Sequence, residues 1–321
     1  MADRHIPEVR LSNIPNLIRE NFEPGFVKAM RRDIPLLSRI KHDSFPGPEI
    51  RWQIHYEGTG AAGSYSETDR LPVADRQKTL RAAVPYKQNW VPVSVTGFAI
   101  ATTKGRGGFV DILAFETKNA LEDLKVAINQ QLMVDKRSNM GKPDTDLDGL
   151  GCIIDDGQVD PTVTGYAGID FATHPWWKPV VLANGGEERD LTIKLLQDLM
   201  RLLEMPRREA KVSTILCARV HYNQYGDLMA SLRRFPPTAT LDGGYPSLAF
   251  DQTKITAIPS LPAGSMYALQ ESSWGYYVSQ NFKTEEKFID ADARYFIITH
   301  YSQLVCRELH KQGRIADLKT V

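Results

Sequence analysis

Apolar and polar residues alternate strictly over two stretches of the chain. Between residues 50 and 56, and again between 91 and 95, every second residue is apolar. This period of two is typical of a strand with one buried face. The segment between them, about 58–88, is rich in Gly, Ser, Asp and Arg, so we expect one long hairpin with this segment at its tip. A lone hairpin is marginal in water and its edges invite pairing, which predicts that it lies on a neighbouring subunit.

The longest helical pattern follows a glycine-rich stretch at residues 105–108. Its apolar residues recur at spacings of three, four and seven positions: Leu113, Ala120, Leu121, Leu124, Ile128 and Leu132. The pattern predicts a helix over about 109–136, roughly 40 Å long at the usual rise per residue. Asn139, Gly141 and Pro143 are expected to end it.

The second half of the chain mixes shorter patterns. The expected elements are helices over about 189–204 and 221–235, and strands over about 214–220, 248–258, 266–271, 295–301 and 304–306. Helices and strands are mixed without regular alternation, so the expected fold class is α+β.

Residues 1–48 are expected to form an irregular arm, because six prolines interrupt them. Any helix in this arm must be short, and the best candidate has Pro35 in its first turn, where a missing N–H costs little. Leu36, Leu37 and Ile40 would then form an apolar stripe that needs a surface to cover.

Composition limits the classes of function. The chain has 321 residues, of which 42% are hydrophobic and 24% charged, as expected for a globular protein of about two domains. Its 39 basic and 39 acidic residues balance, so the whole chain has no electrostatic attraction for nucleic acid. Cys152, Cys217 and Cys306 are far apart, which favours a reducing compartment. Neither a signal peptide nor a membrane span is apparent, and we expect a soluble protein made in a cytoplasm.

Two motifs resemble ligand sites but lack part of the required geometry. Gly58–Gly63 matches the dinucleotide fingerprint G-x-G-x-x-G, yet no helical period follows its third glycine to face a pyrophosphate. The aspartates from Asp144 to Asp155 are spaced like a calcium loop, but the eighth position is Gly151 and the twelfth is not Glu. Aspartate-rich turns also form without any metal.

Two Cys-x-x-x-His pairs start at Cys217 and Cys306. If the first pair lies on a strand, its two residues are about 13 Å apart, whereas the ligands of one zinc lie within about 4 Å of each other. No G-x-S-x-G, H-E-x-x-H or P-loop pattern occurs. The sequence therefore predicts no catalytic residue, no cofactor and no metal site.

The segment Gly165–Lys178 reads Gly-Tyr-Ala-Gly-Ile-Asp-Phe-Ala-Thr-His-Pro-Trp-Trp-Lys. It resembles a stretch typical of tailed-bacteriophage major capsid proteins, in which a Gly-Ile-Asp run leads within a few residues to Trp-Trp. Residues 149–154 resemble the approach to that stretch, and the order of elements along the chain is similar to the Hong Kong 97-type capsid fold. One departure is that Phe171 stands where family members often have arginine.

The resemblance implies a division of the chain. It would comprise an N-terminal arm (1–48), an extended loop (49–97), a peripheral domain (98–154 and 281–321) with the spine helix (109–136), and an axial domain (155–280).

The resemblance also implies a function. The chain would self-assemble, as hexamers and pentamers, into the icosahedral head shell of a bacteriophage around double-stranded DNA, without sequence-specific DNA contact. Portal, scaffolding and decoration proteins would be further partners, and no membrane would be involved. The protein would be made in the bacterial host cytoplasm and reside in the virion. An encapsulin-like compartment is the alternative with the same fold, and a dinucleotide- or calcium-dependent enzyme is the alternative of another class.

The residues expected to contact other subunits lie on the loop and the arm: Trp52, Tyr56, Tyr65, Arg70, Arg81, Leu36 and Leu37. The expected packing anchors are Trp176, Trp177 and Ile169. Because neighbouring residues of a strand face opposite ways, one tryptophan should pack inward while the other covers a neighbouring element or subunit.

Overall fold

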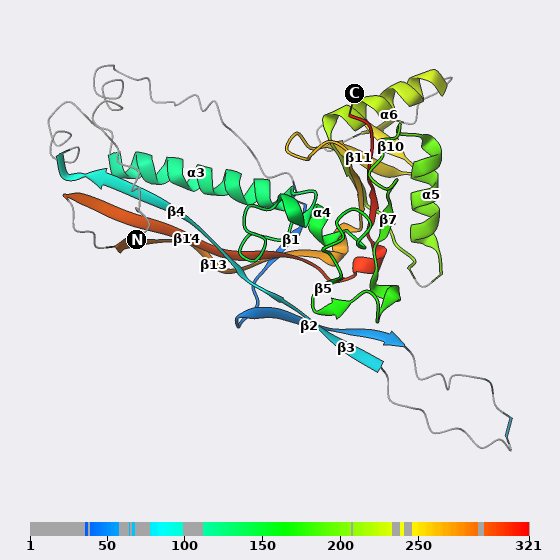
Figure 1. Ribbon diagram of the computed structural model, residues 1–321, viewed down its shortest axis with the longest axis horizontal. Coiled ribbons are helices and arrows are strands. Elements are labelled where there is room, and N and C mark those ends of the chain that lie inside the picture. The colour runs from blue at the N-terminus through cyan, green and yellow to red at the C-terminus, as the bar shows by residue number, and fades with distance from the viewer. Residues whose placement is uncertain are drawn as a thin grey trace.

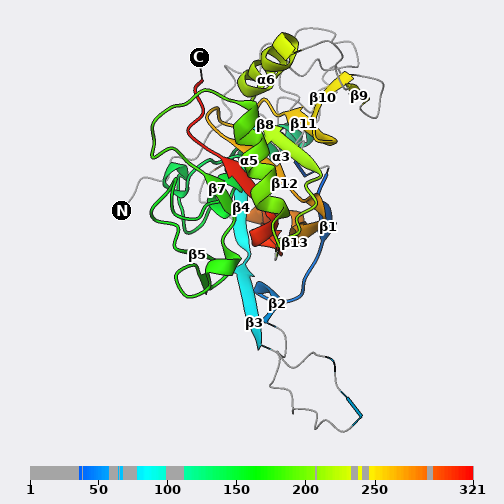
Figure 2. The same cartoon turned by 90° about the vertical axis from the view of Figure 1, so that its right-hand side faces the viewer.

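The computed structural model describes residues 36–37, 39–57, 64, 66–67, 78–98, 112–206, 208–232, 238–240, 246–287 and 292–320. Within them the chain forms a four-stranded sheet, a seven-stranded sheet and a two-stranded arm that extends away from the body (Figures 1 and 2). Helices and strands are mixed along the chain. The expected α+β class is therefore confirmed.

The four-stranded sheet forms the elongated half of the molecule. Its strands in spatial order are β1 (Lys41–Asp43), β13 (Trp274–Lys287), β14 (Ala293–Cys306) and β4 (Lys87–Thr96). The strand β1 runs parallel to β13, and β14 is antiparallel to both of its neighbours, β13 and β4. Helix α3 (Ile112–Leu132) lies along this sheet, packs against β4 and covers one face (Figure 1).

The long helix expected from the sequence is confirmed as α3, which has 21 residues and a length of roughly 32 Å. The buried members of its apolar stripe are Ala120, Leu124, Ile128 and Leu132. The helix ends at Leu132, before the expected end at 136, and residues 109–111 lie outside the described ones.

A close backbone contact packs the next helix against the end of α3. The Gly151 N–H donates to the carbonyl oxygen of Val134, just beyond the helix. A Cβ atom on Gly151 would collide with the backbone of Asp135, so only glycine allows this close approach. The following chain therefore folds tightly against the end of α3, and helix α4 (Leu150–Ile153) is fully buried there.

The seven-stranded sheet lies in the other half of the molecule. Its strands in spatial order are β7 (Val180–Leu182), β15 (Gly313–Ile315), β12 (Met266–Leu269), β8 (Thr214–Cys217), β11 (Thr253–Ala257), β10 (Pro246–Phe250) and β9 (Thr238–Thr240). Helix α5 (Ile193–Glu204) packs on β7 and β15, and helix α6 (Arg219–Leu232) packs on β11. The Thr192 hydroxyl caps α5 by accepting the N–H of Leu195 at 3.3 Å.

Most elements expected in this half are present. The two expected helices are α5 and α6, and the expected strands correspond to β8, β10, β11 and β12. The two strands expected near the end of the chain are one continuous strand, β14. The short elements are the strands β5 (Gly165–Tyr166) and β6 (Ile169–Asp170) and 3-10 turns at Arg137–Asn139, Pro175–Trp177, Glu271–Ser273 and Leu309–Lys311.

The strand pairing expected for the hairpin is wrong. Strand β2 (Glu49–Glu57) pairs with β3 (Lys78–Pro85), whereas the strand over 91–95 is part of β4 and pairs with β14. Ten residue pairs join β4 to β14. This long pairing takes the place of the expected pairing between β4 and β2. Strand β3 lies within the expected tip, which leaves residues 58–77 between the two strands of the arm.

The strands of the two sheets do not come from the residue ranges expected for the two domains. The expected boundary at residue 280 falls inside β13. Strand β15 belongs to the range expected for the peripheral domain, yet it lies in the seven-stranded sheet. The chain therefore returns to that sheet after completing β14.

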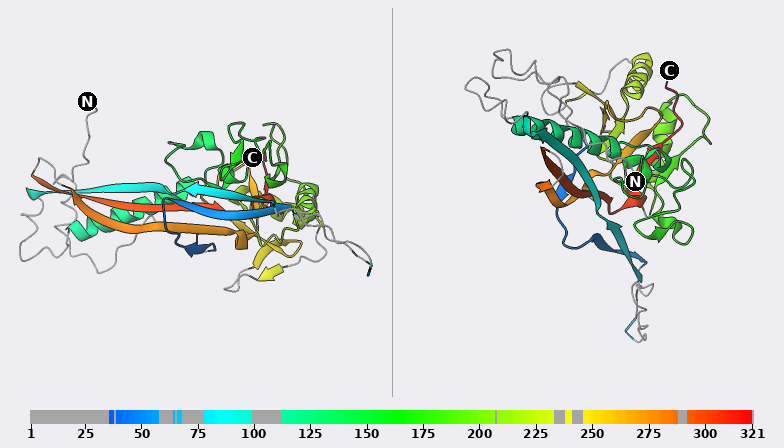
Figure 3. Two further views of the ribbon diagram at one scale, coloured as in Figure 1. Left: turned by 90° about the horizontal axis from the view of Figure 1, so that it is seen from below. Right: turned by 60° about the vertical axis from the view of Figure 1, so that its left-hand side comes forward.

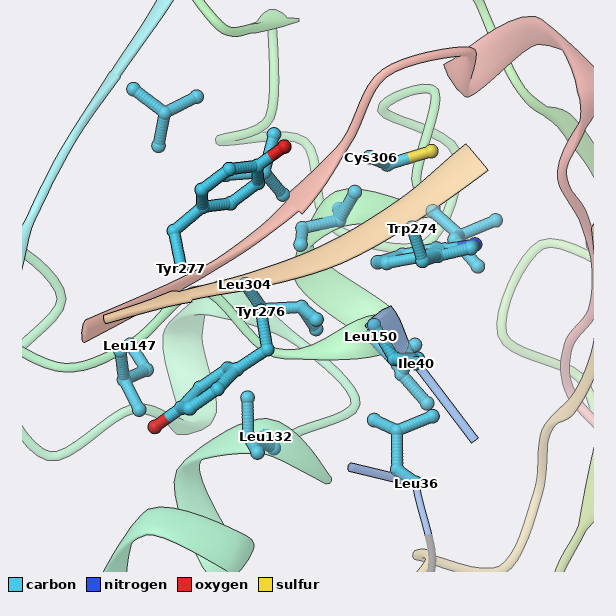
Figure 4. Close-up of a cluster of buried hydrophobic side chains, with 14 of the residues drawn as sticks. Leu36, Ile40, Leu132, Leu147, Leu150, Trp274, Tyr276, Tyr277, Leu304 and Cys306 are labelled. Carbon is cyan, nitrogen blue, oxygen red and sulfur yellow. The ribbon is translucent and has the colours of Figure 1, made fainter. Parts of the chain in front are cut away.

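The turn that precedes β1 packs into the larger hydrophobic core. Leu36 and Ile40 are buried beside Leu132 and Tyr276, under α3 and the four-stranded sheet (Figure 4). The described residues from Leu36 to Ile40 form turns, with the Arg39 N–H donating to the Leu36 carbonyl oxygen. The helix expected here is therefore absent from the described residues, and the arm before residue 36 lies outside them.

A buried arginine links the seven-stranded sheet to the end of α3. Arg314 of β15 has a fully buried side chain that donates to Asp135 Oδ1 at 2.6 Å and to the Gly151 carbonyl oxygen at 3.0 Å. The Tyr267 hydroxyl of β12 donates to the same Asp135 oxygen at 2.5 Å. The buried Asp155 carboxylate lies 3.7 Å from Arg314. This cluster, the Arg314 network, joins the seven-stranded sheet to the end of α3.

Candidate functional site

The two-stranded arm, formed by β2 and β3 and called the hairpin arm below, has two different faces. Ile50, Ala82 and Val84 are buried against the body of the molecule, and Trp52 and Ile54 are partly buried beside them. The arm then continues outward from the body (Figures 1 and 2). The root of the arm thus belongs to the chain's own core, while its outer part extends beyond that core.

The outer face of the hairpin arm is charged. Glu49 forms ion pairs with Arg51 and with Arg81, the second at 3.3 Å, and Glu57 pairs with Lys78 at 2.6 Å. These pairs are exposed, and such pairs contribute little to stability. Their side chains are therefore available for contacts with another molecule.

The segment that contains the Trp-Trp pair anchors the arm. Strands β5 and β6 form a tight hairpin whose turn residues, Ala167 and Gly168, have positive φ angles of 56° and 78°. The Ala167 carbonyl oxygen accepts the Ala83 N–H of β3 at 3.1 Å. This bond attaches the edge of the hairpin arm to the body.

The two tryptophans have different roles. Trp177 is fully buried, and its indole N–H donates to the Tyr166 carbonyl oxygen at 3.4 Å. The Trp176 ring stacks on Tyr56 of β2, with ring centroids 5.3 Å apart and planes 5° from parallel, and His174 meets both rings edge-on. One tryptophan is therefore in the core, and the other covers a neighbouring element. We call Tyr56, His174 and Trp176 the aromatic anchor.

The residues expected at subunit contacts are distributed unevenly. Arg81 is exposed on the outer face of the arm, whereas Trp52 and Tyr56 lie on its inner face and pack at least partly on the chain itself. Leu36 is only 1% exposed, which leaves no surface for a neighbour, while Leu37 is partly exposed. Tyr65 and Arg70 lie outside the described residues.

A second surface was missed by the sequence analysis. Trp90 of β4 is 60% exposed and lies opposite Thr299 of β14. Its neighbour Asn89 is buried on the opposite face, the one covered by α3. Pro92 and Ile297 form the next pair on the same side as Trp90 and are both partly exposed. In Figure 3, left, no described helix lies over the side of this sheet that faces away from α3. The alternation of residues around Trp90 in the sequence could have indicated that its side chain is exposed. We call this surface the Trp90 face.

The motifs considered as ligand sites are engaged in turns. Asp146 accepts the backbone N–H of Lys142, and Asp155 accepts the backbone N–H groups of Gly157 and Asp160. Among the described residues, no group of three or more His, Cys, Asp or Glu side chains is arranged to hold a metal ion. The glycine-rich motif at 58–63 lies outside them.

The three cysteines lie in hydrophobic surroundings. Burial raises the pKa of Cys152 and Cys217 to about 12, and it raises the pKa of Cys306 well above its usual range. These thiols are therefore protonated near neutral pH and unreactive. None of the described helices is both long enough and apolar enough to span a membrane.

Comparison with known proteins places this arrangement among capsid structures. The chain matches the cyanophage A-1(L) capsid asymmetric unit with a TM-score of 0.69 and 16% identity, covering 95% of this chain and 98% of that chain. It matches the capsid of a native GTA particle with a TM-score of 0.65 and 11% identity, covering 97% of this chain and 98% of that chain. The chain has the Hong Kong 97-type capsid fold. The fold expected from the Trp-Trp segment is thereby confirmed.

The same capsid fold also occurs outside phages. The holo-SrpI encapsulin complex from Synechococcus elongatus PCC 7942 matches with a TM-score of 0.62 and 9% identity, covering 98% of this chain and 97% of that chain. No family model matches the chain, and no curated protein matches it. At sequence identities this low, the similarity to these structures concerns the fold alone.

The aromatic anchor yields a first prediction. Replacing Trp176 with alanine should loosen the attachment of the hairpin arm and destabilise the fold by about 2 kcal/mol, less than for a fully buried tryptophan because the ring is partly exposed. Hydrogen exchange should then become faster at the Ala83 amide, while amides of β8 keep their protection.

The control variants are Trp176→Phe, which keeps a ring for stacking, and Trp90→Ala, which removes an exposed tryptophan of the four-stranded sheet. Equal exchange rates at Ala83 in Trp176→Ala and in the unmodified chain would show that the stack does not hold the arm.

Proposed function

We propose that the chain is the major capsid protein of a tailed bacteriophage, which assembles with copies of itself into the icosahedral shell around double-stranded DNA. The observation that carries this proposal is the match to capsid subunits over nearly the full length of both chains. The likeness thus covers at least 95% of each chain compared.

Two features of the chain support assembly. The hairpin arm has a charged outer face and extends beyond the core, and the Trp90 face exposes a tryptophan on an open sheet. Tryptophan and arginine are enriched where binding energy concentrates at interfaces. We propose that each arm contacts a neighbouring subunit within hexamers and pentamers, using Arg81 together with the expected contact residues Tyr65 and Arg70.

The charge of the chain suits the inside of a shell. With 39 basic and 39 acidic residues, the wall encloses DNA without binding it tightly or by sequence. Portal, scaffolding and decoration proteins are the further partners proposed. The location proposed is the virion, after synthesis in the cytoplasm of the bacterial host.

The four-stranded sheet with α3 corresponds in this proposal to the peripheral domain, and the seven-stranded sheet to the axial domain. The expected ranges are adjusted so that all of β13 belongs to the first and β15 belongs to the second.

A second candidate is an encapsulin-like compartment, which the match to the SrpI encapsulin favours. Both candidates form closed shells from one repeated chain. They differ in their contents, which are DNA in the first case and a cargo protein in the second.

The test is to express the full chain and examine the purified material by electron microscopy. Shells, sheets or rings of capsomers are expected. A monodisperse small oligomer at every protein concentration and ionic strength would contradict both candidates. Nuclease-protected DNA in particles from the natural source supports the capsid, whereas particles that hold a second protein in place of DNA support the compartment.

A further inference from the structure

A groove of about 730 Å³ lies at the end of β1. Its lining includes Leu37 and Asp43, Ile128 of α3, and Tyr276 and Phe282 of β13. Its volume is in the range of sites that bury a ligand or several side chains. The groove is separate from the hairpin arm and from the Trp90 face.

The groove lies where β1 would continue along β13 if β1 were longer. β1 pairs with β13 only at Gly275–Tyr277, although β13 runs on to Lys287. Among the described residues, no strand pairs with the outer edge of β13 beyond Tyr277. That edge contains no proline, whereas β4, at the opposite edge of the same sheet, contains Pro92. Unpaired edges of this kind accept an added strand.

The wall of the groove contains an exposed aromatic ring, Phe282, next to a buried histidine, His300. Phe282 is 36% exposed and stacks on His300, with ring centroids 4.5 Å apart. His300 is only 3% exposed, and its Nε2 atom is 3.0 Å from the Tyr276 hydroxyl. Its Nδ1 atom is buried without a hydrogen-bond partner among the described residues. An occupant that covers Phe282 would bury the exposed part of this ring.

The chain itself supplies a candidate occupant. Residues 1–35 precede Leu36, and Leu37 is already part of the groove wall. A segment tethered at the groove has an effective concentration there in the millimolar range, far above that of a separate molecule. It contains apolar residues such as Leu17, Ile18 and Phe26. Its prolines favour extended backbone in the residues before them and are tolerated in an edge strand.

We propose that this groove binds an extended stretch of residues 1–35 of the same chain, which continues the row of β1 along the outer edge of β13. This segment then closes the sheet edge of its own subunit and covers Phe282. The inference is independent of the capsid proposal, because it concerns one subunit and its own N-terminal residues.

The test uses the full-length chain with a photoreactive group in the groove. Asn281 is exposed and lines the groove, so an Asn281→Cys variant can be labelled with a maleimide benzophenone. The native cysteines are buried and stay unlabelled. After illumination of the unassembled subunit, we expect a crosslink between the labelled position in β13 and a peptide from residues 1–35, in a product of monomer mass.

Crosslinks only in products of dimer mass would overturn the proposal in favour of a second copy as occupant. Crosslinks only to residues 36–321 of the same chain would show that the segment does not enter the groove. Ser279→Cys, also exposed in the groove, provides a second labelling position if the first variant does not fold. The matched control is Lys211→Cys, which is exposed on the other half of the molecule and should not crosslink to residues 1–35.

Discussion

Replacing Arg314 with leucine is expected to destabilise the subunit by about 3–5 kcal/mol, which is the usual cost of removing one partner from a buried ion pair. The leucine leaves the buried Asp155 carboxylate without its cation and Asp135 without the 2.6 Å hydrogen bond. The Gly151 carbonyl oxygen and the Ser265 hydroxyl also lose a donor. The measurement is the midpoint of urea unfolding of the unassembled subunit.

The matched control is Arg201→Leu. Arg201 lies on the exposed side of α5 and pairs with Asp198 at 3.7 Å, so its loss should cost no more than about 1 kcal/mol. If both variants unfold at similar urea concentrations, the Arg314 network contributes no more than a surface pair. The double variant Arg314→Leu with Asp135→Leu should recover part of the loss, because fewer buried charges then remain unpaired.

Shortening the tip of the hairpin arm is expected to abolish assembly and leave the subunit folded. The cut must respect the observed pairing. A deletion of residues 60–86 would remove β3, whose Ala82 and Val84 side chains are buried in the core, and the subunit would then be destabilised as well. Replacing residues 60–76 with Asn-Gly keeps both strands of the arm and joins them by a short loop of a length common in hairpins.

Two measurements separate folding from assembly in this variant. Thermal unfolding should be close to that of the unmodified chain, while sedimentation and electron microscopy should show no particles. A control with residues 60–76 in scrambled order keeps the length of the tip and tests whether its sequence matters. Normal shells from the Asn-Gly variant would disprove the role of the tip in subunit contacts.

Local periodicity allowed much of the fold to be predicted. The alternation over residues 50–56 identified β2, and the apolar stripe through Leu124 and Ile128 identified α3. These patterns depend only on which side chains face the core, which is set by the geometry of a single element. The Trp-Trp segment added the family resemblance and with it the fold.

Contacts between distant parts of the chain were harder to predict. The partner of β2 was missed because Ala82 and Ala83 give β3 a weak apolar pattern, and small residues can be buried without producing one. The stack of Trp176 on Tyr56 joins residues far apart in the sequence. Arg314 lies in a strand of three residues, too short for a periodic signal, and nothing local indicates that its charge is buried.

The order in which the sheets are completed has a consequence for synthesis on the ribosome. β14 lies between β13 and β4, and β15 lies between β7 and β12, so each sheet contains an internal strand from late in the chain. A nascent chain that has not yet reached residue 293 cannot close either sheet, although domains usually fold as units while they are made. Unfinished chains therefore lack the rigid body that supports the hairpin arm, and under the proposed function only chains that have been translated through β15 would assemble.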